Sequence, residues 1–129
     1  MPTITFICYP RCSTCRKAQG WLDDNGVPYE RRDISNDAPT AEELREWRDA
    51  SGLPIRRLFN TSGARYRELG MRSRLDAGMT DEECYAALAT DGMLVKRPIL
   101  VIRDDDAPVV ALFGFKEETW AQALQALPA

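Results

Sequence analysis

Short apolar runs alternate with segments of helical periodicity near the start of the chain. Residues 4–9 form an apolar, β-favouring run that ends at Pro10, and residues 12–25 then place apolar side chains on one face of a helix. A second β-favouring run covers residues 27–34. Because a helix separates the two runs, the pattern predicts two parallel strands joined by a helical crossover.

The middle of the chain carries helical signals. Two capping boxes, Thr40–Glu43 and Thr80–Glu83, each predict the start of a helix. Between them we expect a short helical turn at residues 55–59 and a short helix around residues 65–69. The sequence therefore predicts a helical insertion over roughly residues 38–92.

The last third of the chain returns to strands. Residues 99–102 and 109–113 are apolar runs separated by a turn-rich segment, which predicts an antiparallel hairpin. Residues 116–127 then have helical spacing, with Trp120 and Leu127 on the inward face. This hairpin and helix complete the chain.

The complete order is β-α-β, a helical insertion and β-β-α, which is an α/β arrangement of the thioredoxin-like type. No repeat, low-complexity stretch or linker divides the chain, so we expect residues 1–129 to form a single domain. No apolar run approaches the roughly 20 residues that span a bilayer, and the N-terminus lacks the basic start of a signal peptide. We therefore expect a cytoplasmic, monomeric protein with no membrane contact.

Composition narrows the chemistry that the chain can perform. The formal net charge is −3, so no global basic field is present to bind nucleic acid directly. The chain contains no histidine, which removes the usual general base and the commonest nitrogen ligand of metals. Any chemistry would have to use cysteine, carboxylates, arginine, lysine or backbone dipoles, and we expect no bound metal or cofactor.

Cys12 and Cys15 lie where the first predicted strand gives way to the first predicted helix. The free N–H groups and positive dipole of a helix N-terminus stabilise a thiolate, and Arg11 and other flanking cations add positive charge. We therefore predict that the pKa of Cys12 is lowered and that Cys12 is the attacking thiolate. Cys15, one helical turn further on and facing inward, suits the resolving thiol. The alternative, two small buried hydrophobic residues, does not explain the flanking cations.

Cys8 and Cys84 are better explained as core residues than as ligands of a metal or an iron–sulfur cluster. Together with Cys12 and Cys15, Cys8 has the spacing of the iron–sulfur site in radical enzymes that bind S-adenosylmethionine. Those enzymes need a barrel of about 200 residues or more, and Cys8 falls inside a predicted strand. A zinc site would require the distant Cys84 as fourth ligand and has no histidine to offer. We therefore predict that both are core residues.

Arg97 and Pro98 precede the third predicted strand. In thioredoxin-like folds this loop lies against the active-site cysteine and often contains a cis proline. A cis bond here would direct Arg97 toward Cys12 and an anionic substrate. An ordinary strand start preceded by surface cations explains the pattern equally well.

Four segments together resemble the ArsC/Spx family of arsenate reductase-like proteins. They are, in chain order, residues 9–18, 58–63, 91–98 and 114–116. The resemblance covers nearly the whole chain and is strongest for the arsenate reductase-like branch. It implies a thioredoxin-like fold with a helical insertion.

The resemblance also implies site residues. In the glutathione- and glutaredoxin-linked arsenate reductases one cysteine attacks arsenate and three arginines bind the oxyanion; Cys12 matches the cysteine and Arg97 one arginine. Asn60 aligns with the second arginine, close to Arg56 and Arg57, and the third falls in an apolar strand. The expected substrate-binding residues are Arg11, Ser13, Thr14, Asn60 and Pro98.

Two functions remain open at this point. The first is a thiol–disulfide oxidoreductase or arsenate reductase-like enzyme with a Cys12–Cys15 redox pair, recycled by thioredoxin or by glutathione with glutaredoxin. The second follows from the resemblance to the Spx-like regulators, which carry C-x-x-C as a redox switch and bind the α subunit of RNA polymerase. A thioredoxin-fold adaptor whose cysteines do not turn over is a third, simpler interpretation.

Overall fold

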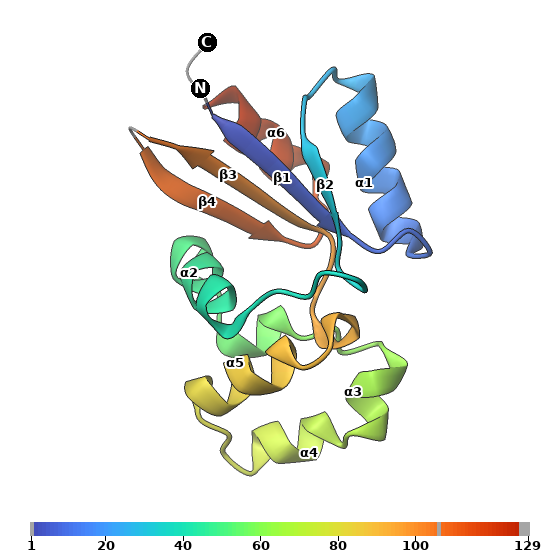
Figure 1. Ribbon diagram of the computed structural model, residues 1–129, viewed down its shortest axis with the longest axis vertical. Helices are drawn as coiled ribbons and strands as arrows, with labels where there is room; N and C mark the ends of the chain where they lie inside the picture. Colours follow the sequence, from blue (N-terminus) through green and yellow to red (C-terminus); the bar gives the residue numbers. More distant parts are fainter. Residues whose placement is uncertain (1, 106, 127–129) are drawn as a thin grey trace.

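A four-stranded mixed sheet forms the centre of the computed structural model, which describes residues 2–105 and 107–126 (Figure 1). The strands are β1 (Thr3–Cys8), β2 (Glu30–Asp33), β3 (Ile99–Asp104) and β4 (Ala107–Phe113). In the order β2-β1-β3-β4, β1 is parallel to β2 and antiparallel to β3, and β4 is antiparallel to β3. The predicted thioredoxin-like fold and both predicted strand pairings are confirmed.

Helices cover both faces of this sheet (Figure 1). The alternation of side chains along β1 places Phe6 and Cys8 in the same buried cluster as residues of α1 (Ser13–Asp24) and α6 (Glu117–Gln125). Ile7 points to the opposite face, where it joins Leu44 and Trp47 of α2 (Ala41–Ser51). The predicted inward faces of these helices are confirmed by this burial. The predicted inward position of Leu127 lies outside the described residues.

The predicted helical insertion between β2 and β3 is confirmed, and it contains two elements that the sequence pattern missed. After α2 it consists of η1 (Ile55–Leu58), α3 (Ala64–Glu68), α4 (Met71–Asp76), α5 (Asp81–Ala89) and η2 (Gly92–Leu94). Neither α4 nor η2 was predicted, because six and three residues give too few periodic positions. Gly70 ends α3 and, in the left-handed conformation, is also the N-cap residue of α4.

Two strand boundaries differ from the prediction for reasons that involve proline. β2 begins at Glu30 and not at residue 27, because Pro28 has no N–H to give to the ladder. β4 begins earlier than predicted, at Ala107, and includes Pro108. Proline is tolerated there because β4 is an edge strand.

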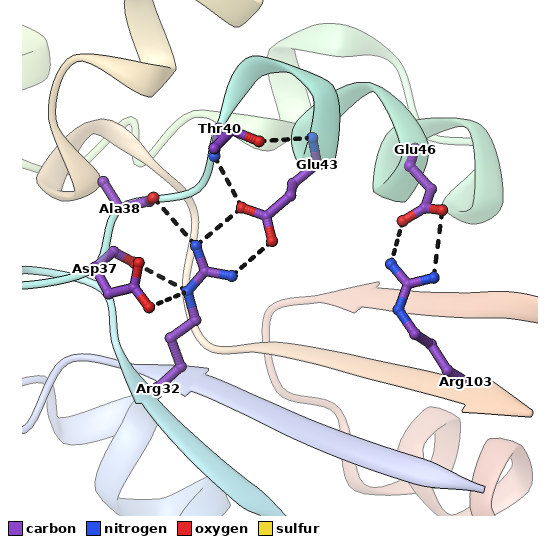
Figure 2. A network of polar contacts seen from close by, with 7 residues as sticks. All are labelled: Arg32, Asp37, Ala38, Thr40, Glu43, Glu46 and Arg103. Atoms are coloured by element: carbon purple, nitrogen blue, oxygen red, sulfur yellow. Dashed lines mark hydrogen bonds and ion pairs between the residues drawn. The ribbon is translucent and has the colours of Figure 1, made fainter.

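Two arginines on the sheet hold α2 in place (Figure 2). Arg32 of β2 donates from Nη1 and Nη2 to the Glu43 carboxylate at 2.7 and 2.9 Å. The same carboxylate accepts a hydrogen bond from Thr40 N–H at 3.0 Å, so it also completes the predicted capping box. Further along the helix, Arg103 of β3 pairs with Glu46. The first turn and the middle of α2 are thereby fixed against the sheet.

None of the helices within the described ranges is long and apolar enough to cross a membrane.

Candidate functional site

Cys12 stands at the point where the chain leaves the sheet and enters α1. It is the N-cap residue of α1, with extended backbone angles of φ −85° and ψ 122°. A tight turn brings it there, because Cys12 N–H donates to Tyr9 O at 3.0 Å, and Arg16 N–H donates to Cys12 O at 3.0 Å. The side chain is half-exposed and lines a cleft of about 770 Å³.

The surroundings of Cys12 favour its thiolate. Partial burial raises the pKa of Cys12, but the backbone amide and thiol of Cys15, the charge of Arg97 and the backbone amide of Thr14 together outweigh burial and lower it. These amides belong to the first turn of α1, whose N–H groups have no partner within the helix. Cys12 is therefore the more acidic and more nucleophilic thiol of the pair.

Cys15 has the opposite character. It is only 2% exposed, and its Sγ accepts a hydrogen bond from Tyr9 N–H at 3.4 Å. Burial raises the pKa of Cys15 to about 12, and the neighbouring Cys12 adds to this increase while the Tyr9 amide opposes it. Two thiols one helical turn apart therefore differ in both exposure and acidity, and Cys15 lies behind Cys12 and outside the cleft.

The other two cysteines belong to the core, as predicted. Cys8 is 1% exposed and accepts a hydrogen bond from Arg31 Nε at 3.4 Å, and Cys84 is fully buried in the helical insertion. All four cysteines of the chain are free thiols. Across residues 2–105 and 107–126, no group of three or more His, Cys, Asp or Glu side chains is placed to hold a metal ion.

Arg97 reaches the cleft from the segment between η2 and β3. Its guanidinium carbon lies 5.3 Å from the centre of the Tyr9 ring, and Nη1 donates to Met93 O at 3.3 Å and Val95 O at 3.4 Å. Its Nε is buried without an acceptor among the described residues. The Arg97–Pro98 peptide bond is cis. The guanidinium is thus held by an aromatic ring and by backbone carbonyls, and no carboxylate of residues 2–105 or 107–126 forms an ion pair with it.

The charged side chains among the described residues that line the cleft are all cationic. The five that line it are Arg11, Arg57, Lys96, Arg97 and Lys116. Among the described residues that line the cleft there is no Asp or Glu, and none of the five cations forms an ion pair with a described residue. The paired cations lie elsewhere: Arg32, Arg45, Arg48, Arg56, Arg65 and Arg103. The cleft is therefore locally positive in a chain whose net charge is −3.

The structure brings most of the sequence-predicted site residues to this cleft. Arg11, Ser13 and Thr14 line it together with Cys12. Asn60 also lines it, because Asn60 N–H donates to Leu94 O at 2.7 Å and so ties the loop after η1 to η2. Pro98 does not line the cleft: it is buried, and its carbonyl accepts a hydrogen bond from Gly114 N–H at 2.8 Å.

Sequence reasoning did not place three of the five cations that line the cleft, namely Arg57, Lys96 and Lys116. Arg56 and Arg57 could not be distinguished from sequence; Arg57 lines the cleft, whereas Arg56 pairs with Asp76 on α4. Lys96 precedes Arg97 in the same motif, and Lys116 ends the short motif at residues 114–116. Position inside a recognised motif was the available signal for both lysines, but nothing in the sequence showed that both reach the same cleft.

The chain resembles known proteins over nearly its whole length. The model of the ArsC family matches residues 8–123. The uncharacterized protein YusI of Bacillus subtilis is 42% identical over 92% of this chain and 99% of its own length, and the regulatory protein MgsR of the same organism is 30% identical over 76% of this chain and 75% of its own.

Solved structures agree with these sequence relationships. An ArsC family related protein from Bacteroides fragilis superposes with a TM-score of 0.83 at 47% identity, covering 93% of this chain and 96% of that one. A protein named "possible arsenate reductase" from Streptococcus mutans superposes with a TM-score of 0.79 at 38% identity, covering 94% and 99%. With a family model that matches most of its residues and relatives that share both sequence and fold, the chain belongs to the ArsC family.

Proposed function

We propose that the chain is a thiol–disulfide oxidoreductase in which Cys12 is the nucleophile and Cys15 the resolving thiol. The observation that carries this proposal is the contrast between the two thiols. Cys12 faces a positive cleft and has a lowered pKa, whereas Cys15 is buried one turn behind it and its pKa is raised to about 12. Thiol exchange needs this combination, because only the exposed thiolate should meet the substrate.

The exchange proceeds in two balanced steps. The Cys12 thiolate attacks one sulfur of a substrate disulfide, which forms a mixed disulfide and releases the other half of the substrate as a thiolate. Cys15 then gives up its proton to solvent or to the released thiolate and attacks the Cys12 sulfur. The second half of the substrate leaves as a thiolate, which takes a proton from solvent, and the protein retains a Cys12–Cys15 disulfide. Two protein thiols are oxidised and one substrate disulfide is reduced.

Turnover requires a reductant, which would be a dithiol protein such as thioredoxin or two equivalents of glutathione, with or without glutaredoxin. This recycling fits a cytoplasmic location, where the thiol pool is reducing. Arg97, together with Arg11, Ser13, Thr14 and Asn60, would bind the anionic part of the substrate. Arsenate is a second candidate oxidant for Cys12, and the name of the Streptococcus mutans relative supports testing it.

The deciding experiment is a redox titration of the purified protein. The sample is unfolded at each potential so that all remaining free thiols can be alkylated, and the alkylation is read by mass spectrometry. We expect Cys12 and Cys15 to become protected from alkylation together while Cys8 and Cys84 stay reduced. The midpoint potential would show whether thioredoxin or glutathione can recycle the pair. If Cys12 takes up glutathione and Cys15 remains alkylatable, the dithiol mechanism is wrong and the chain works through a single thiol.

A redox-sensing regulator that binds the α subunit of RNA polymerase is the second candidate. The similarity to the regulatory protein MgsR favours it. The C-x-x-C pair of this chain also fits it, because the resemblance to the Spx-like regulators implies such a redox switch. Here the Cys12–Cys15 disulfide would change affinity for a partner and would not need fast turnover. Pull-down of the polymerase α subunit by the reduced and oxidised protein separates the candidates, because a pure oxidoreductase should capture none in either state.

A further inference from the structure

The cleft holds more positive charge than activation of Cys12 requires. Arg97 is the cation that acts on the Cys12 thiol. Lys96, Lys116 and Arg57 line the same cleft and come from three different segments, the loop before β3, the start of α6 and η1. None of these three pairs with a carboxylate of the described chain. Unpaired cations in a cleft attract and orient anionic ligands.

The two lysines lie beside one rigid turn. A Cβ built on Gly114 would lie 3.2 Å from Lys96 Cε, so the Lys96 side chain passes over Gly114. Lys116 follows two residues later as the N-cap residue of α6. Gly114 N–H donates to Pro98 O at 2.8 Å, and Gly114 O accepts from Trp120 Nε1 at 3.0 Å. The backbone of Gly114 is therefore fixed through both its N–H and its carbonyl group, and the two lysines lie beside it in the lining of the cleft.

The size and the remaining lining of the cleft indicate an organic ligand. Its volume of about 770 Å³ lies within the range of roughly 300 to 1,000 Å³ that is typical of sites for drug-sized molecules, and exceeds the need of a single oxyanion. The apolar part of the lining includes Leu53, Phe113, Phe115 and Trp120. Glu117 and Glu118 follow Lys116 in the first turn of α6, but neither lines the cleft.

We propose that the cleft selects small disulfides that carry carboxylates, with Lys96 and Lys116 binding the carboxylates while Cys12 attacks the disulfide. This inference rests on the exchange proposed for Cys12 and Cys15, and the anionic disulfide would be reduced by the same two steps. The lysines change no bond themselves. They raise the local concentration of an anionic substrate and favour its orientation in the cleft, so they determine specificity and leave the chemistry to the thiols.

The test compares two chromogenic disulfides that differ in charge. Dithiobis(nitrobenzoate) carries two carboxylates, whereas dithiodipyridine is uncharged at neutral pH. The rate of Cys12 oxidation by each probe is measured by stopped flow in the reduced protein and divided by the rate for a neutral model thiol, N-acetylcysteinamide. We expect the normalised rate for the anionic probe to be about tenfold or more higher than the normalised rate for the neutral probe. This ratio should fall toward one as the salt concentration rises to about 0.5 M.

The double variant Lys96→Gln/Lys116→Gln identifies the residues responsible. Its anionic-to-neutral ratio should fall about fivefold, because two cations leave the cleft. The matched control is the double variant Arg72→Gln/Arg74→Gln, which removes two exposed cations from α4, outside the cleft, and should keep the wild-type ratio. An equal fall in the control would show a general charge effect and overturn the proposal.

The result also separates this inference from the proposed function. If neither probe oxidises Cys12 faster than the model thiol, the exchange at Cys12 itself is in error. If both probes react rapidly and the ratio is one, or is unchanged in the double variant, the exchange stands and selection by Lys96 and Lys116 is wrong.

Discussion

The guanidinium carbon of Arg97 lies 5.3 Å from the centre of the Tyr9 ring, so an aromatic face supports this cation beside Cys12, and no carboxylate of the described residues pairs with it. A carboxylate partner would neutralise the guanidinium and weaken its effect on the thiolate. The aromatic ring holds the cation in place and leaves its charge available. Tyr9 also donates its backbone N–H to Cys15 Sγ. One residue thereby contacts both the resolving thiol and the cation.

Replacing Arg97 with glutamine should make Cys12 less acidic. Burial raises the pKa of Cys12, the amide and thiol of Cys15 lower it, and Arg97 adds to the lowering. Without Arg97 the thiolate fraction falls, and we expect alkylation of Cys12 by iodoacetamide at neutral pH to slow about threefold to tenfold. Arg97→Lys keeps the charge but loses planar stacking on Tyr9, so its rate should be intermediate. Equal rates in all three proteins would show that Arg97 does not act on this thiol.

The two thiols should respond differently to pH. Only a thiolate is alkylated. Because the pKa of Cys12 is lowered, Cys12 should still be alkylated at a pH at which an ordinary cysteine is protonated and no longer reacts. Burial raises the pKa of Cys15 to about 12, so it should stay unreactive at neutral pH. Mass spectrometry after brief alkylation across a pH series checks both expectations. Cys15 labelling at or below the pH needed for Cys12 would reverse the assigned roles.

Substituting the thiols one at a time should trap different states. Cys12→Ser should not react with substrate disulfides, because Cys15 is buried. Cys15→Ser should stop at the mixed disulfide on Cys12, since the resolving thiol is absent. Intact-mass measurement after exposure to a disulfide distinguishes the two, and rapid release of both halves by Cys15→Ser would rule out the resolving role. Cys84→Ser, in the helical insertion, tests whether a core cysteine contributes to either step.

The half-buried ion pair between Arg32 and Glu43 should make the free energy of unfolding depend on pH in the acidic range. The Arg32 hydrogen bonds hold the pKa of Glu43 below its usual range, although burial opposes them. A lowered carboxyl pKa means that this stabilisation is present above the unfolded value of about 4.3 and is lost as the pH falls through the folded value.

Glu43→Gln should therefore lower the free energy of unfolding by about 1 to 2 kcal/mol at neutral pH, because a partly buried charged hydrogen bond and part of a capping box are lost. The difference from wild type should shrink in acid, below the pH at which the unfolded carboxyl titrates. Urea unfolding of both proteins at several pH values measures this difference in the free energy of unfolding. Glu82→Gln is the control, because its pair with Arg45 is exposed and should contribute little to stability.

Local chemistry made the centre of the site predictable, and long-range packing made the rest unpredictable. Cys12, Cys15 and the start of α1 share one short segment, so strand, turn and helix could be placed from adjacent residues. Arg97 was located by its proline neighbour and by the resemblance. The composition of the cleft has no such local signature, because it depends on how α6 and the helical insertion meet the sheet.

The elements η1 and α4 show why the environments of single residues could not be predicted from the sequence. The pairing of Arg56 with Asp76 requires α4 to lie beside η1, and α4 itself was missed because six residues carry too little periodicity. Once Arg56 is paired on that side, Arg57 is the arginine of η1 that remains for the cleft. Neighbouring arginines with identical propensities therefore received different environments from tertiary structure alone.

Gly92 illustrates a constraint that neither a motif nor a turn type reveals. A Cβ on Gly92 would lie 2.1 Å from the carbonyl oxygen of Ile34, so η2 packs directly on the backbone after β2. Nothing but hydrogen fits there, and a methyl group must push two backbone segments apart. The same η2 supplies the Met93 carbonyl that accepts from Arg97, so this close approach also supports the cleft.

Gly92→Ala should consequently lower the free energy of unfolding by about 2 to 3 kcal/mol, the upper part of the usual cost of overpacking. Gly20→Ala is the matched control, because Gly20 lies within α1 and a Cβ there meets no atom within 4 Å. Alanine should stabilise that helix by about 0.5 to 1 kcal/mol. Urea unfolding of both variants should therefore give changes of opposite sign. A loss of stability in both would point to a general intolerance of alanine, whereas a neutral Gly92→Ala would show that η2 can move away from Ile34 without cost.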